Sequence, residues 1–193
     1  MDTNEGEEKM NQSALIISGS RNPDGQTAQA LQAIENGLYS QNIQVETIYI
    51  PTAYLEHCRQ CENNGWGDCR KLGTCVINDD FAEIVDQLRA VDLVVFATPV
   101  YYGDLSESLR AFTDRLRRIC THPDGKTNIS GKPAIGICVA GGGGGGAPEC
   151  CVSLKKVLRT CGFDMLDMIP VRRQNLQMKL TQLEEIGKWM SNS

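Results

Sequence analysis

Short runs of consecutive aliphatic residues alternate with helix-like stretches along almost the whole chain. The runs lie at residues 14–18, 45–50, 92–103, 133–140 and 163–171. The first, third and fourth are nearly unbroken, which is typical of strands covered on both faces in a parallel sheet. The alternation therefore predicts one parallel sheet with helices packed on both sides.

Apolar residues at helical spacing fill the segments between these runs. Helices are expected at 27–39, 106–119, 147–162 and 180–191, and another after the Asp-Asp pair at 79–80, which can cap it. This order indicates a three-layer α/β/α, doubly wound sheet of five strands in the order 2-1-3-4-5. Ligands bind where such an order reverses, so the loops after the first, third and fourth strands are expected to build the site.

The charge balance argues against one broad class of function. With 19 basic and 24 acidic residues the chain carries a net charge of −5, so general nucleic-acid binding is not expected. The densest basic run, at 115–118, is expected on a solvated helix face. No apolar run reaches the roughly 18 residues that a membrane helix needs.

A single domain is expected from a chain of 193 residues. Residues 1–12 are acidic and polar, unlike a signal or transit peptide, and are expected to form a disordered tail. The domain would then span 13–193, with a cysteine-rich insertion at 51–78.

The nine cysteines divide into two groups. With no export signal, this number indicates a reducing, cytoplasmic compartment. Four of them, Cys58, Cys61, Cys69 and Cys75, fall in one polar, glycine-containing stretch. The remaining five, which are expected to be inert packing residues, are Cys120, Cys138, Cys150, Cys151 and Cys161.

The first of the three loops, SGSRNPDGQT at 18–27, offers hydroxyls and free backbone N–H groups at the start of a helix. The positive end of a helix dipole suits a phosphate group. Ser20, Arg21 and Thr27 can add hydrogen bonds, and Arg21 can add charge. This loop matches neither G-x-G-x-x-G nor G-x-x-x-x-G-K-[ST], so it supports neither a Rossmann dinucleotide site nor a nucleotide triphosphatase. An ordinary strand-to-helix turn is the alternative interpretation.

The second and third loops have the composition of a ligand site. TPVYYGDLS at 98–106 places two tyrosines beside Gly103, and aromatic rings there can face a flat, conjugated ligand. The tyrosines also suit a core or an interface between subunits. AGGGGGGAPE at 140–149 joins a buried strand to a helix, and its glycines permit close approach of the backbone to a ligand.

Together these loops resemble the NAD(P)H-dependent FMN reductase and iron–sulfur flavoprotein branch of the flavodoxin-like superfamily, over about residues 13–175. The motifs are GSRNPDGQT, TPVYYGDLSESLRAFTDRL and VAGGGGGGA. The resemblance implies that the FMN ribityl phosphate is bound by Ser18, Ser20, Arg21, Gln26 and Thr27. It implies that the isoalloxazine ring is lined by Pro99, Val100, Tyr101, Tyr102 and Gly103. The other side of the flavin would be closed by Gly141, Gly142, Gly143 and Gly144.

The cysteine stretch has a counterpart in the same branch. Iron–sulfur flavoproteins carry a compact cysteine motif before a D-D-containing helix, typically C-x2-C-x2-C and then a fourth cysteine. This chain has C-x2-C-x7-C-x5-C followed by VINDD, so its middle gap is longer. A [4Fe-4S] cluster on all four thiolates requires the insertion at 63–67 to loop out. A structural zinc and labile thiols or a redox disulfide remain alternatives.

The resemblance implies an FMN oxidoreductase in which hydride passes from NADH or NADPH to FMN. Electrons would then reach a cluster or an external acceptor, either a small molecule or a protein. Homodimers or homotetramers are expected from the same resemblance. Three alternatives stay open: a cluster-free reductase of quinones, azo dyes, nitro compounds or metal ions, an electron carrier reduced by a ferredoxin, and a zinc-stabilised interaction module without flavin.

Overall fold

The computed structural model describes residues 12–192, and the expected tail at 1–12 lies almost entirely outside this range. Five parallel strands form one sheet: β1 (Ser13–Ser18), β2 (Gln44–Tyr49), β3 (Leu93–Pro99), β4 (Pro133–Ala140) and β5 (Asp164–Arg172). Six helices accompany them: α1 (Gln26–Tyr39), α2 (Asp68–Lys71), α3 (Phe81–Ala90), α4 (Glu107–Ile119), α5 (Ala147–Cys161) and α6 (Leu176–Met190).

The strand order is β2-β1-β3-β4-β5, and every pairing is parallel. The predicted fold class is therefore confirmed. The third strand ends at Pro99, as the proline there predicts, and the residues that follow form a turn. The last helix begins at Leu176, four residues before the expected start.

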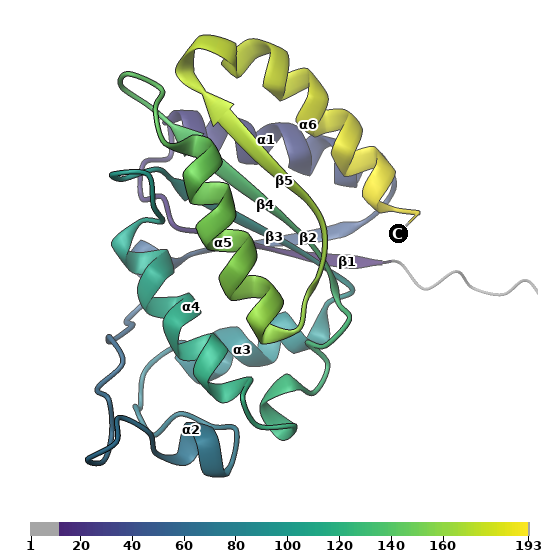
Figure 1. Ribbon diagram of the computed structural model, residues 1–193. Helices are drawn as coiled ribbons and strands as arrows, with labels where there is room; N and C mark the ends of the chain where they lie inside the picture. The colour runs from purple at the N-terminus through teal and green to yellow at the C-terminus, as the bar shows by residue number, and fades with distance from the viewer. Residues whose placement is uncertain (1–11, 193) are drawn as a thin grey trace, which may run out of the picture.

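Helices cover both faces of the sheet (Figure 1). Helices α1 and α6 pack on one face, where their apolar residues share a core with alternate residues of the strands. Helices α3, α4 and α5 pack on the other face and bury a second core that includes Phe96 and Phe112. Strands β1, β3 and β4 are buried on both sides, which explains their unbroken aliphatic runs.

Two glycines let α1 and α6 pack closely. A Cβ added at Gly37 would stand 2.1 Å from the carbonyl oxygen of Glu184 and 2.9 Å from the Cα of Gly187. A Cβ at Gly187 would stand 2.5 Å from the carbonyl oxygen of Ile34. The two backbones are thus in direct contact, and neither position has room for a side chain.

Gly37→Ala is expected to destabilise the fold by about 1–3 kcal/mol, because overpacking forces the two helices apart. Chemical denaturation measures this change. Gly145→Ala is the matched control, because a Cβ there meets nothing within 4 Å. Equal stability of the two variants would contradict the close contact between α1 and α6.

The cysteine-rich insertion lies between β2 and α3 in the chain. It contains the short helix α2, which packs against α4 at the lower end of the molecule in Figure 1. Of the two aspartates expected to cap α3, Asp79 accepts a hydrogen bond from the backbone N–H of Phe81 at 3.2 Å. The carboxylate of Asp80 instead accepts from the backbone N–H of Tyr54 at 2.7 Å, so Asp80 fastens the insertion and does not cap the helix.

Within residues 12–192, no helix combines the length and the apolar character that crossing a membrane requires.

Candidate functional site

The loops that follow β1, β3 and β4 meet at the carboxyl edge of the sheet and enclose a cavity of about 410 Å³. This volume lies within the range of small-molecule sites. The cavity is lined by Ser20, Asn22, Gly25, Gln26, Thr27, Pro99, Val100, Tyr101, Val139, Ala140, Gly141, Gly142 and Gly145. All three loops singled out in the sequence contribute to it.

The loop after β1 is fastened to the start of α4. The backbone N–H of Gly19 donates to the carbonyl of Ala97 at 2.8 Å, and the hydroxyl of Ser108 donates to the carbonyl of Gly19 at 3.4 Å. A Cβ at Gly19 would stand 2.4 Å from Oγ of Ser106. Only glycine therefore fits here, and the loop is held in one position beside α4.

The N-terminus of α1 is available to a ligand. The first N–H groups of any helix have no partner within that helix. In this 14-residue helix no side chain caps them either. The side chains of Ser20 and Thr27 are buried beside them, and Oε1 of Gln26 is buried without a hydrogen-bond partner. Unpaired donors at a helix start, with hydroxyls nearby, suit a phosphate group.

Two of the residues assigned to the phosphate occupy other positions. Ser18 is fully buried, and its Oγ accepts from the backbone N–H of Ser20 at 3.2 Å, which shapes the loop. Arg21 is exposed and is not part of the cavity wall. Asn22, which was not predicted, lines the cavity, and its Oδ1 accepts from the backbone N–H of Asp24 at 3.0 Å.

The loop after β3 forms a tight hairpin turn. Tyr101 and Asp104 exchange two backbone hydrogen bonds of 3.0 Å, and both residues between them have positive φ, +51° at Tyr102 and +76° at Gly103. This pairing of positive φ values is that of a type I′ turn. Pro99, Val100 and Tyr101 line the cavity, whereas Tyr102 and Gly103 do not. The ring of Tyr102 is fully exposed to solvent.

The glycine-rich loop after β4 closes the cavity on the opposite side. Gly144 donates its N–H to the carbonyl of Gly141 at 2.8 Å, and a Cβ at Gly141 or Gly142 would meet nothing within 4 Å. Gly143 accepts from the amide of Gln174 at 3.1 Å, so this end of the loop turns toward the chain after β5. Space therefore remains beside the loop for a ligand.

Gly146 is the point where the second and third loops touch. Its φ is +82°, and an added Cβ would stand 2.7 Å from the Cα of Gly103. Gly146→Ala is therefore expected to push the loops apart and to weaken binding of the FMN that the resemblance implies by about 10- to 100-fold. Quenching of flavin fluorescence measures this affinity.

Gly131→Ala serves as the matched control for that variant. Its φ of +79° is close to that of Gly146, but an added Cβ would meet nothing within 4 Å and Gly131 does not line the cavity. Equal FMN affinities of the two variants would show that contact between the loops does not shape the cavity.

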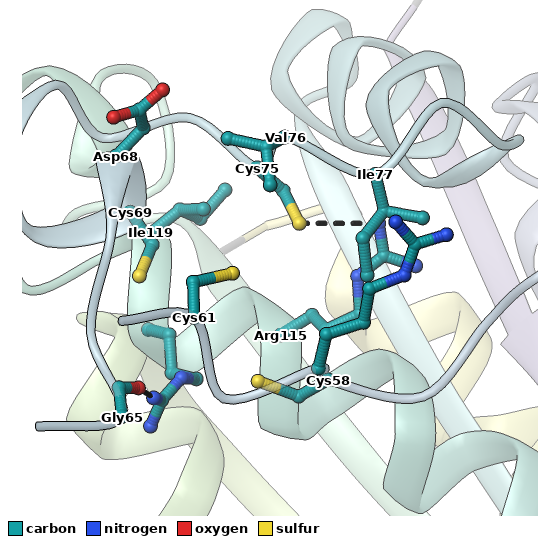
Figure 2. Close-up of a pocket in the computed structure, with 12 residues that line it drawn as sticks. Cys58, Cys61, Gly65, Asp68, Cys69, Cys75, Val76, Ile77, Arg115 and Ile119 are labelled. Carbon is teal, nitrogen blue, oxygen red and sulfur yellow. Dashed lines mark hydrogen bonds between the residues drawn. The ribbon is translucent and has the colours of Figure 1, made fainter. Parts of the chain in front are cut away.

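The four cysteines of the insertion line a second, much smaller cavity (Figure 2). All four are half-buried and free of disulfides. The cavity measures about 20 Å³ and shares its wall with Ile77, Arg115, Arg118 and Ile119, among others. Within residues 12–192, no three cysteine, histidine, aspartate or glutamate side chains are gathered closely enough to bind one metal ion. The thiols therefore surround a space instead of converging on a point.

The segment at 63–67 contains a turn, in which the backbone N–H of Gly65 donates to the carbonyl of Glu62 at 3.2 Å. A Cβ at Gly67 would stand 2.9 Å from the Cβ of Cys61, so the chain packs directly against Cys61 on its way back to Cys69. The ring of Trp66 lies 4.3 Å from the guanidinium of Arg118, which also donates to the carbonyl of Gly65. Glycine at position 67 and this cation–π contact bring Cys69 to the cavity.

The basic run at 115–118 does not lie wholly on a solvated face, which corrects the sequence prediction. The side chain of Arg115 is 1% exposed and that of Asp79 is 0% exposed. Their bidentate contact has Nη1–Oδ2 and Nη2–Oδ1 distances of 2.6 and 2.9 Å. A buried guanidinium requires such a partner, since an unpaired charge is costly to bury.

The pair carries full charge at neutral pH. Burial by itself raises the pKa of Asp79. Hydrogen bonds from Arg115 and from the backbone N–H groups of Glu56 and Phe81 outweigh burial, so the pKa of Asp79 lies below its ordinary value. Burial likewise lowers the pKa of Arg115, but hydrogen bonds to Asp79 and Cys75 leave it raised.

The other five cysteines are buried, as predicted for packing residues. Hydrogen bonding with neighbouring thiols, and then burial, raises the pKa of Cys138 and of Cys161. These thiols are therefore protonated at neutral pH. His57 is exposed beside Cys58 and is not part of the cavity wall.

A doubly wound sheet with a ligand-sized cavity at its topological reversal, between an uncapped helix and a glycine-rich loop, defines the flavodoxin-like class. The chain belongs to the NADPH-dependent FMN reductase family, whose model matches residues 13–179. The resemblance noted in the sequence is thereby confirmed.

The chain is also similar to a curated flavoprotein. An iron–sulfur flavoprotein of Methanocaldococcus jannaschii is 29% identical over 126 residues, which cover 65% of this chain and 63% of the relative. The match thus spans less than two thirds of that protein.

Among solved structures, an NAD(P)H:quinone oxidoreductase from Methanothermobacter marburgensis aligns with a TM-score of 0.69 at 17% identity, covering 93% of this chain and 96% of the other. An archaeal flavodoxin aligns with a TM-score of 0.58 at 14% identity, covering 94% and 100%. These two likenesses show the fold.

Proposed function

We propose that this protein is an FMN-dependent oxidoreductase that takes its electrons from NAD(P)H. We further propose that Cys58, Cys61, Cys69 and Cys75 hold a [4Fe-4S] cluster that passes electrons to an external acceptor. Family membership supports the first part. The observation that carries the second part is the arrangement of four free thiols from one loop around one cavity.

The residues at the carboxyl edge suit FMN. The uncapped start of α1, with Ser20 and Thr27 buried beside it, would hold the phosphate. Pro99, Val100 and Tyr101 would line the ring on one side, and Gly141 and the following glycines on the other. FMN supplies hydride and electron chemistry when bound, and the chain supplies position and electrostatics. Backbone N–H groups near the ring would stabilise negative charge on it.

The donor set of the insertion suits a cluster better than a single ion. A zinc ion holds thiolates at about 2.3 Å, which brings the sulfurs to about 3.8 Å from one another. The described cysteines are not gathered in that way. A cluster has several irons and accepts ligands that stand further apart. Gln60 and Glu62, on either side of Cys61, have positive φ of +50° and +56°. Turns of this kind direct backbone N–H groups toward anions and recur at iron–sulfur sites.

The two cavities lie at opposite ends of α4. Ser106, at its start, contacts the loop after β1, and Arg115 reaches the cysteines. At 1.5 Å per residue, the nine steps from Ser106 to Arg115 span about 14 Å. One helix therefore links the flavin cavity to the cysteine cavity within a single chain.

An anaerobic titration with NADPH, and in parallel with NADH, tests the proposed function. Bleaching of the flavin bands, followed by the electron paramagnetic resonance signal of a reduced cluster, is expected. Flavin that stays oxidised with both nicotinamides would contradict the reductase and would favour an electron carrier reduced by another protein.

A cluster-free reductase is the second candidate. The cysteine cavity of about 20 Å³ has room for about one water molecule, so a cluster requires the four side chains to move outward. If the thiols are free, titration of the native protein would find four reactive thiols. The five buried cysteines would then react only after unfolding.

The proposal also covers the external electron acceptor and the oligomeric state. The acceptor is a small molecule or a protein, and the expected assembly is a homodimer or a homotetramer. Size-exclusion chromatography with light scattering tests the assembly.

A further inference from the structure

Arg115 contacts both ends of the cysteine insertion with one side chain. Its Nη1 donates to the carbonyl of Glu56 at 3.0 Å, two residues before Cys58. Its Nη2 donates to Sγ of Cys75, the last of the four cysteines, at 3.3 Å (Figure 2). Both nitrogens also donate to Asp79, at 2.6 and 2.9 Å. A single guanidinium therefore fixes the entry and the exit of the loop against α4.

The surroundings hold this guanidinium in place. The carboxylate of Asp79 also accepts from the backbone N–H of Glu56 at 2.8 Å and from that of Phe81 at 3.2 Å. The ring of Phe81 lies 4.2 Å from the guanidinium carbon of Arg115. With 1% of its side chain exposed, Arg115 is screened little by solvent. Lysine cannot reproduce these contacts, because it lacks the planar fork.

We infer that Arg115 is a positioning residue for the cluster proposed above, and that its hydrogen bond to Cys75 raises the reduction potential of that cluster. Reduction adds negative charge to a cluster, and N–H donors and positive charge at its ligand sulfurs stabilise the reduced state. The carboxylate of Asp79 offsets part of the positive charge of Arg115, but it leaves the hydrogen bond from Arg115 to Cys75 in place. The inference rests on the proposed function.

The test compares the wild type with Arg115→Lys, with the double variant R115M/D79N, and with the control Arg117→Met. The double variant removes both charges together, because a lone buried carboxylate would destabilise the fold. Lysine keeps a positive charge in the pocket and loses the fork. Arg117 lies on the same helix and carries the same charge, but it pairs with Asp114 at 3.0 Å and does not line the cysteine cavity.

Iron and FMN per chain, and the midpoint potentials of cluster and flavin, are measured in each protein under anaerobic conditions. In R115K and R115M/D79N a cluster potential more negative than that of the wild type is expected, together with less iron per FMN. The flavin potential is expected to stay unchanged, because Arg115 lies outside the flavin cavity. R117M is expected to keep the wild-type potential, because Arg117 does not line the cysteine cavity.

These measurements distinguish a failure of the proposed cluster from a failure of the inference about Arg115. Wild-type protein without iron would overturn the proposed cluster itself. Wild-type protein with a cluster, and both Arg115 variants with unchanged cluster potential, would overturn the inference alone. Loss of iron without a shift in the potential of the remaining clusters would reduce Arg115 to a structural role and would also overturn it.

Discussion

Iron is expected to be lost when Cys61 and Cys69 are both replaced by alanine. The content should fall from about four atoms per chain to nearly none, because two of the four thiolate ligands are gone. FMN should remain at the wild-type level, since neither residue lines the flavin cavity. Iron, sulfide and flavin analysis of the anaerobically purified variant measures both quantities.

Cys151→Ala is the matched control for this variant. Cys151 lies on α5, where it is buried in the core, and is not part of the insertion. Its removal is expected to lower stability modestly and to leave the iron content unchanged. Full iron in C61A/C69A, or equal loss of iron in both variants, would contradict the assignment of the cluster to the insertion.

The second large effect is expected at the start of α1. Replacing Ser20 and Thr27 together by alanine should weaken FMN binding by about 100-fold or more, because hydrogen bonds to a charged group contribute about 1.5–3 kcal/mol each. Both hydroxyl residues are buried beside the uncapped helix N-terminus. Titration of the flavin-free protein with FMN gives the dissociation constant.

Ser40→Ala removes a hydroxyl from the opposite end of the same helix. The Oγ of Ser40 donates to the carbonyl of Gly37 at 2.7 Å and lies away from the cavity. This variant is expected to bind FMN as the wild type does. A purified S20A/T27A protein that retains full flavin would show that the phosphate binds elsewhere.

The sheet was predictable because its signal is local. Strands β1, β3 and β4 are covered on both faces, and each needs a run of aliphatic residues that is visible without knowing the partners. Strict alternation with helices then restricts the topology. The three ligand loops follow from the same rule, since they must stand at the carboxyl ends of these strands.

Side-chain directions in the site were less predictable. Tyr101 and Tyr102 look equivalent in the sequence, yet the turn places Tyr101 in the cavity wall and Tyr102 in solvent. Ser18 and Ser20 also look equivalent, yet only Ser20 lines the cavity. The Oγ of Ser18 instead accepts a hydrogen bond from the backbone N–H of Ser20 and so shapes the loop. These outcomes depend on one or two φ angles, and residue type alone does not fix them.

The buried pair of Arg115 and Asp79 depends on a contact between residues 36 positions apart. A basic run at a helix end is usually solvated, and nothing in its spacing marks one arginine as buried. The useful signal was the acidic pair that ends the insertion, which was interpreted only as a helix cap. Long-range pairing of charges requires the fold to be known first.

The most direct test is an anaerobic visible spectrum of the purified protein, with iron, sulfide, zinc and flavin determined on the same sample. Flavin bands on a broad iron–sulfur shoulder, with about four iron and four sulfide per chain, are expected. Flavin bands without iron would contradict the cluster and leave a cluster-free reductase. A colourless protein that does not take up added FMN would contradict the flavin site as well.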